Sequence, residues 1–126
     1  MSAKAFKPTR LELEMLEALW RLGTASIREI QGSLPEDERP EFTTVQTIIY
    51  RLEQKGAVER VKRIGNANIF RAIVTRKSAI GSLVDDFLGH FAGSHEPILT
   101  HLAESGRISA AELKQIEKLI RERKTK

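Results

Sequence analysis

The chain has 126 residues, of which 40% are hydrophobic and 30% are charged, and its formal net charge is +4. This composition excludes wholesale disorder and a fibrous repeat, and the lack of cysteine excludes disulfides and thiolate metal sites. No apolar run approaches the roughly 20 residues that span a bilayer, and the basic N-terminus lacks the apolar core of a secretory signal, so we expect a cytoplasmic protein without membrane insertion.

Two helices are predicted at the start of the chain. The first begins after Thr9, because Thr9 and Glu12 have the spacing of a capping box, and it ends at Gly23. Apolar residues surround most of this helix, which predicts a central position in the core. The second is short, and Ser26 and Glu29 form another capping box at its start. An acidic loop with two prolines follows, at residues 35–42.

A third helix is predicted to begin at Thr43 or Thr44 and to end at Gly56. Its apolar residues recur at the spacing of a buried face, while its outer positions carry hydroxyls, amides, a phenol and a guanidinium, which can read the edges of bases in a major groove. Arg51 could reach guanine, although a solvated or internally paired arginine is an equal alternative for this residue alone. Gln46 or Gln54 could pair with adenine, and the threonines at the helix start could hold phosphate. The predicted DNA-binding residues of this helix are Thr43, Thr44, Gln46, Thr47, Tyr50, Arg51 and Gln54.

A β-hairpin follows the third helix. Two segments rich in β-branched residues, 57–64 and 68–74, flank residues 65–68, whose glycine and asparagines suit a turn. Basic residues concentrate here: residues 42–77 contain eight Lys or Arg and two Asp or Glu. Arg60, Lys62, Arg63 and Arg71 are therefore predicted to contact phosphates or enter a minor groove, and the sequence leaves open which of them do so and which are only solvated.

From residue 78 the chain is predicted to be helical, in three segments. The first runs to Gly93, the second opens at Pro97, and the third opens with a capping box of Ser109 and Glu112. These helices carry apolar stripes that one chain has little volume to enclose, which favours a homodimer; the alternative is that they fold back on the N-terminal core. The predicted dimerisation residues are Ile80, Leu83, Val84, Phe87, Leu88, Phe91, Ile98, Leu102, Leu113, Ile116 and Ile120.

The sequence offers little support for an enzyme. His90, His95 and His101 lie in the helical tail, but no metalloprotease spacing, nucleophile elbow or glycine-rich phosphate loop accompanies them. We expect no catalytic residues, no metal and no cofactor.

The segments "LELEMLEALWRLGTASIREI" and "TTVQTIIYRLEQKGAVER", followed by a hairpin and a helical tail, resemble the penicillinase-repressor family, the BlaI and MecI type of bacterial transcriptional repressors. The resemblance runs from about Thr9 to about Lys124 and implies a homodimer that binds a dyad-symmetric operator. In the best-known members, a membrane-bound sensor protease responds to β-lactam and cuts the repressor within its dimerisation segment. That cut falls at an Asn-Phe pair, whereas the corresponding stretch here is Ile98-Leu99-Thr100-His101-Leu102. A copper-sensing branch uses cysteine pairs, which this chain lacks.

The predicted fold is mainly α with a small β-hairpin wing: a winged helix-turn-helix at residues 1–76 and a helical dimerisation domain at residues 77–126. The predicted function is dimeric, sequence-specific repression of transcription, with derepression by proteolysis near Thr100 and His101 as the route that the resemblance implies. The alternative functions are a ligand-responsive winged-helix regulator and a protein-interaction module. The basic segment 42–77 argues against the module.

Overall fold

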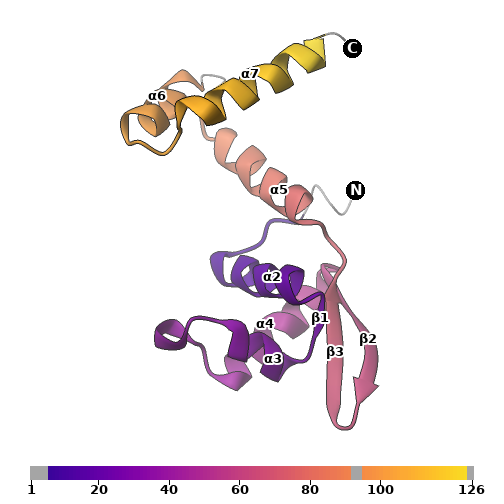
Figure 1. The fold of residues 1–126 in the computed structure, drawn as a ribbon. Helices are drawn as coiled ribbons and strands as arrows, with labels where there is room; N and C mark the ends of the chain where they lie inside the picture. Colours follow the sequence, from indigo (N-terminus) through magenta and orange to yellow (C-terminus); the bar gives the residue numbers. More distant parts are fainter. Residues whose placement is uncertain (1–5, 92–94, 125–126) are drawn as a thin grey trace. The chain divides into compact units, whose positions relative to one another are not determined.

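The computed structural model describes residues 6–91 and 95–124, and the chain divides into two compact units, Met1–Phe87 and Leu88–Lys126 (Figure 1). The first unit contains the predicted three helices and hairpin, together with a short extra strand and a single 3-10 turn. Its elements are α2 (Arg10–Leu22), β1 (Thr24–Ala25), α3 (Ile27–Ser33), η1 (Glu36–Glu38), α4 (Phe42–Gln54), β2 (Val58–Ile64), β3 (Ala67–Ala72) and all but the last residue of α5 (Arg76–Leu88).

All three predicted capping boxes are present. At the start of α2, the Thr9 hydroxyl accepts from the Glu12 amide at 3.1 Å and the Thr9 amide donates to Glu12 Oε1 at 2.9 Å. The same reciprocal pair joins Ser26 to Glu29 before α3, at 3.1 and 2.8 Å. A residue of this kind at a helix start contributes about 1 kcal/mol, because it satisfies backbone amides that the helix leaves unpaired.

The recognition-helix candidate α4 begins at Phe42, so the prediction that Thr43 or Thr44 begins it is wrong by one or two residues. Glu41 occupies the N-cap in an extended conformation, and its carbonyl accepts from the amides of Thr44 and Val45. Its side chain makes no capping hydrogen bond, which is why a search for a hydroxyl cap missed it. The predicted end is confirmed, since the backbone reverses at Gly56 with φ +80°.

The sheet has three antiparallel strands in the order β1-β3-β2. The predicted hairpin of β2 and β3 is confirmed, but its loop is shorter than predicted, because Ala67 and Asn68 pair in β3 and only Gly65 and Asn66 form the turn. Gly65 has φ +59°, as the first central position of a type II′ turn requires. The pairing shifts between Arg60 and Lys62, which leaves Val61 as a bulge. The two-residue strand β1 was not predicted.

The core of the first unit lies between α2, α3, α4 and β3. Its largest fully buried side chains include Met15, Leu16 and Leu19 of α2, Ile30 of α3, Ile49 and Leu52 of α4, and Phe70 of β3. The indole of Trp20 packs against this cluster, and its Nε1 donates to the carbonyl oxygen of Val74 at 3.0 Å. The core therefore fixes α4 by its inner face and leaves its outer face open.

Helix α5 ends at Leu88, so the predicted continuation to Gly93 is wrong for the described residues: Phe91 lies beyond the helix, in a turn closed on the carbonyl of Leu88. Gly93 itself lies outside the described residues. The compact units divide after Phe87, within this helix, whereas the predicted domains divide at residue 76. The assignment of α5 to a dimerisation domain stays a prediction.

The second unit consists of α6 (Glu96–Glu104) and α7 (Ala110–Lys124), joined through Gly106 with φ +76°. The predicted capping box of Ser109 and Glu112 begins α7, with hydrogen bonds of 3.1 and 2.8 Å. None of the residues described between Leu88 and Arg123 is buried. This unit therefore has apolar side chains but no interior of its own.

Candidate nucleic-acid interface

The outer face of α4 carries the predicted set of polar side chains. Thr43, Thr44, Thr47, Tyr50, Arg51 and Gln54 are exposed, and Gln46 is partly buried. The opposite face buries Val45, Ile48, Ile49 and Leu52 in the core, so the helix is held rigidly from behind. A helix exposed in this way fits into the major groove of DNA, where its side chains can form hydrogen bonds with the bases.

Two of the predicted cations have no side-chain partner within the described part of the chain. Arg51 on α4 and Lys62 on β2 are exposed and make no hydrogen bond or ion pair there. Their charges are therefore available to an external anion without breaking an internal contact.

Arg60, by contrast, is held between α4 and the hairpin. Its Nε and Nη2 donate to the two carboxylate oxygens of Glu53 at 2.9 and 3.2 Å, and its guanidinium lies 5.1 Å from the ring centroid of Tyr50 and 5.5 Å from that of Phe70. The hydrogen bond that Arg60 donates to Glu53 is the largest of the effects that raise the pKa of Arg60 above its ordinary value. Arg60, which was predicted to contact phosphate, thus forms a bidentate ion pair with Glu53 and stacks on an aromatic ring, and these contacts link β2 to α4.

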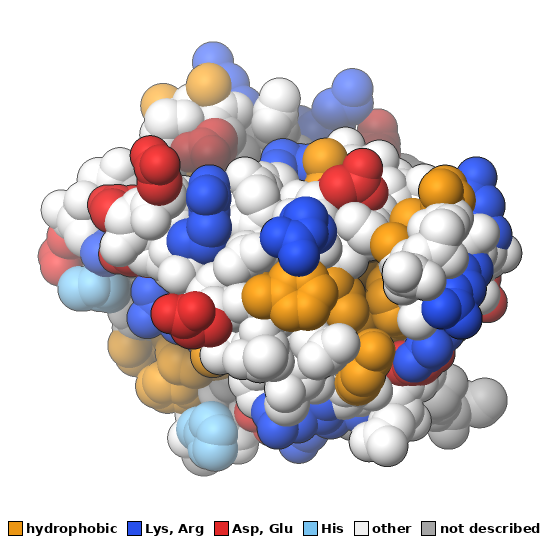
Figure 2. Space-filling view, turned by 90° about the horizontal axis from the view of Figure 1, so that it is seen from below, with side chains coloured by type: hydrophobic (Ala, Val, Ile, Leu, Met, Phe, Trp, Pro, Cys, Tyr) orange, Lys and Arg blue, Asp and Glu red, His pale blue; other side chains and the backbone are white. Residues whose placement is uncertain are grey.

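The other two predicted hairpin cations also have internal partners. Arg63 Nε donates to the carbonyl oxygen of Gly65 at 3.1 Å, which braces the turn, and Arg71 pairs with Glu59 on the neighbouring strand. Figure 2 shows Lys and Arg side chains gathered at the right of the view, where the hairpin lies in Figure 1. The hairpin is therefore basic, but the structure gives its four cations different roles.

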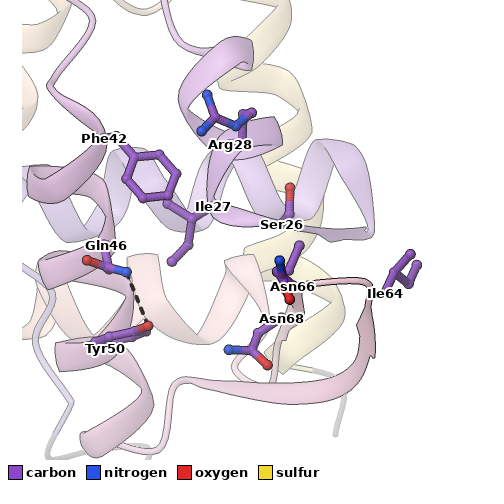
Figure 3. Close-up of a pocket in the computed structure, with 10 residues that line it drawn as sticks. Ser26, Ile27, Arg28, Phe42, Gln46, Tyr50, Ile64, Asn66 and Asn68 are labelled. Atoms are coloured by element: carbon purple, nitrogen blue, oxygen red, sulfur yellow. Dashed lines mark hydrogen bonds between the residues drawn. The ribbon is translucent and has the colours of Figure 1, made fainter.

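The structure adds residues that the sequence analysis missed. Arg28 at the start of α3 lies over the ring of Phe42, with its guanidinium carbon 5.1 Å from the centroid. Asn66 on the hairpin turn and Asn68 at the start of β3 line a groove shared with α3 and α4 (Figure 3). The sequence does show an arginine in the first turn of α3, next to the candidate recognition helix, and this position could have been predicted as a DNA contact. The sequence analysis assigned α3 only to the core.

The predicted dimerisation residues are partly or fully exposed. Val84, Phe87, Phe91, Leu113, Ile116 and Ile120 are exposed, and Ile80, Leu83, Leu88, Ile98 and Leu102 are partly buried. In the second unit, the large apolar residues Leu99 and Leu119 are also exposed, and they are not in the predicted set. On α7 the exposed apolar residues recur at three- and four-residue intervals, so they share one face.

None of the described helices is both long and apolar enough to cross a membrane. Among the residues that the structure describes, no group of three or more His, Asp or Glu side chains is placed to hold a metal ion.

Comparison with known proteins identifies the family. The penicillinase repressor family matches residues 8–122. The penicillinase repressor of Bacillus licheniformis is 22% identical over 116 residues, which cover 91% of this chain and 90% of that protein.

Solved structures agree on the fold. The chain of the hsRosR-S4 complex matches with a TM-score of 0.51 at 20% identity, over 82% of this chain and 94% of that one. The oxidised form of MarR from E. coli matches with a TM-score of 0.50 at 18% identity, over 90% of this chain and 74% of that one. These likenesses confirm the predicted winged-helix fold class, and the family match shows that the protein belongs to the penicillinase-repressor family of transcriptional repressors.

Proposed function

We propose that this protein is a dimeric, sequence-specific repressor that recognises a dyad-symmetric DNA operator. In this proposal, α4 enters the major groove and the hairpin contacts the flanking backbone or minor groove. The observation that carries the proposal is the outer face of α4, where Arg51 is exposed among hydroxyl and amide side chains and has no partner within the described residues. The membership of a repressor family supports the same function.

The proposed dimer rests on the second unit. Leu113, Ile116, Leu119 and Ile120 of α7 are between 42% and 64% exposed. Burying an apolar side chain of this size contributes roughly 1.5 to 3 kcal/mol, and a second copy of the same unit provides the matching apolar face. A dimer of this kind would present two α4 helices related by two-fold symmetry to the DNA.

Derepression is proposed to act on this second unit. Thr100 and His101 are exposed on α6, and a cut near them would separate α7 from the winged helix. Loss of the proposed dimer would then release the operator. The agent in this proposal is a membrane-bound sensor protease, as the family resemblance implies.

Selection of bound sequences from random DNA tests the proposed function directly. We expect a palindrome whose half-sites lie about one helical turn apart, because two α4 helices related by two-fold symmetry would read them. Binding should weaken steeply with salt, with a log-log slope near −7 if a dimer neutralises about eight phosphates. Absence of salt-dependent DNA binding would instead favour a protein-interaction module, and recovery of no common sequence would contradict operator recognition.

Replacement of Arg51 with alanine should weaken binding to the selected operator by about 1 to 3 kcal/mol, because a guanidinium that reads a base contributes that much discrimination. Binding to random DNA should change much less. Titrations of both DNAs at one salt concentration provide the measurement. Gln31→Ala on α3, a partly buried residue whose amide donates to the carbonyl oxygen of Pro40, is a control outside the proposed contact. Equal losses on both DNAs would make Arg51 a phosphate contact.

Replacement of Arg60 tests whether this residue positions the hairpin or contacts DNA. If Arg60 positions the hairpin, Arg60→Lys should lower the preference for operator over random DNA about tenfold, since lysine keeps the charge but loses the bidentate, stacked geometry. The salt slope should stay the same. If Arg60 contacts a phosphate, Arg60→Lys should be nearly neutral and Arg60→Gln should reduce the slope by about one per subunit.

A further inference from the structure

A groove lies between α4, the start of α3 and the hairpin turn, with a volume of about 330 Å³ (Figure 3). Phe42, Gln46 and Tyr50 recur every four residues and form its wall on α4. Ser26, Ile27 and Arg28 line it from α3, and the hairpin contributes Ile64 and residues 66–68. The groove is therefore bounded by both of the elements that the proposed function places on DNA.

Three polar side chains of this groove already have protein partners: the Ser26 hydroxyl accepts from the Glu29 amide, and Gln46 Nε2 donates to the Tyr50 hydroxyl at 3.3 Å (Figure 3). The other three, Arg28, Asn66 and Asn68, can donate to a ligand. The side chains of Asn66 and Asn68 make no hydrogen bond within the described residues, and the guanidinium of Arg28 has only its stacking contact with Phe42 there. No acidic side chain lines the groove. A single free cation with neighbouring amide donors and no carboxylate matches an anion of low charge.

The apolar side chains that line the groove limit further which ligand it can bind. The rings of Phe42 and Tyr50, together with Ile27 and Ile64, offer surface that inorganic phosphate would not use. A deoxyribose ring has an apolar face and is joined directly to a phosphodiester. The mixture of donors and apolar surface thus fits a sugar-phosphate chain better than a small inorganic anion.

We propose that this groove holds the backbone of one operator strand where it passes between the major groove occupied by α4 and the minor groove beside the hairpin. In a duplex, adjacent major and minor grooves are separated by one sugar-phosphate strand, so that strand must pass between α4 and the hairpin when both are docked. Arg28 pairs with a phosphate, and Asn66 or Asn68 donates to the same or the neighbouring phosphate. This inference rests on the proposed function.

The test combines protein variants with single neutral phosphates in the selected operator. Each phosphate of a half-site is replaced in turn by methylphosphonate, and binding is measured for the wild-type protein, Arg28→Ala, Asn68→Ala and Arg51→Ala. For the wild type, one substitution beside each half-site should cost about tenfold, as expected for loss of a charge-assisted hydrogen bond. Arg28→Ala should bind the unmodified operator about tenfold more weakly and should lose little more at that phosphate.

Arg51→Ala is the matched control, because it removes a cation from α4 outside the groove and should keep the full sensitivity to that phosphate. Arg28→Lys should retain most of the sensitivity, which separates the charge contact from the packing of Phe42. Independent, multiplicative losses for Arg28→Ala and every methylphosphonate would overturn the inference and leave the groove to another occupant, such as a small effector. Failure of the wild-type protein to bind any selected DNA would instead overturn the proposed function.

Discussion

The variant Ile116→Asp/Ile120→Asp is expected to be a monomer and to bind the full operator roughly 10²- to 10⁴-fold more weakly than the wild type, because two linked half-site contacts become independent. Both isoleucines are exposed on one face of α7, at 42% and 53%. Two carboxylates there would have to be buried without partners in any interface between copies. Binding to an isolated half-site should be unchanged, since each winged helix keeps its own contacts.

The control for this variant is Lys114→Gln/Lys118→Gln. It changes the net charge by the same amount, −2, on the same helix, but the two lysines lie on the face opposite to the isoleucines. Light scattering gives the mass of each variant, and circular dichroism checks that α7 remains helical. A full-mass dimer for the isoleucine variant would show that the stripe of α7 is not the interface, and a monomeric wild type would remove the proposed dimer altogether.

The elements that the sequence predicts well are those whose signals are local. The capping box of Thr9 and Glu12 and the glycine at position 56 mark helix ends through backbone geometry within a few residues. The buried face of α4 follows from its apolar spacing in the same way. The start of α4 was predicted late because the N-cap residue is Glu41, whose side chain makes no capping hydrogen bond, while threonines that could serve as caps follow it.

The features that the sequence could not supply depend on contacts between distant segments. Strand β1 exists only because Thr24 pairs with Arg71, some 47 positions later. The basic count over residues 42–77 located the candidate interface, but it treated Arg60 and Lys62 alike. The structure separates them, because Arg60 Nε lies 2.9 Å from Glu53 Oε2, whereas Lys62 makes no ion pair with the described residues. The number of basic residues in a segment indicates a basic surface, but only the ion pairs in the structure show which of these residues can bind an external anion.

The ion pair of Glu12 and Lys55 connects the start of α2 to the end of α4. The side chain of Glu12 is 1% exposed, and its second carboxylate oxygen accepts from Lys55 Nζ at 2.7 Å. Its first carboxylate oxygen accepts a hydrogen bond from the Thr9 amide, so both oxygens have a hydrogen-bond partner. Because Lys55 is the C-cap of α4, this buried carboxylate ties the far end of the candidate recognition helix to the central helix of the core.

Replacement of Lys55 with methionine is expected to lower the free energy of unfolding of the first unit by roughly 3 kcal/mol, because the buried charge of Glu12 loses its cation. Urea unfolding followed through Trp20 measures the loss as a lower midpoint at constant slope. Addition of Glu12→Gln to this variant should recover part of the lost stability, since no unpaired buried charge remains at position 12.

The exposed pair of Arg10 and Glu14 on α2 supplies the control, with side chains 87% and 43% exposed. Glu14→Gln should cost no more than about 0.5 kcal/mol, as expected of a solvated pair at this helical spacing. Equal small losses for Lys55→Met and Glu14→Gln would mean that water reaches Glu12 and replaces the lysine. A loss of stability confined to Lys55→Met, accompanied by weaker operator binding, would identify this pair as the contact that fixes the orientation of α4.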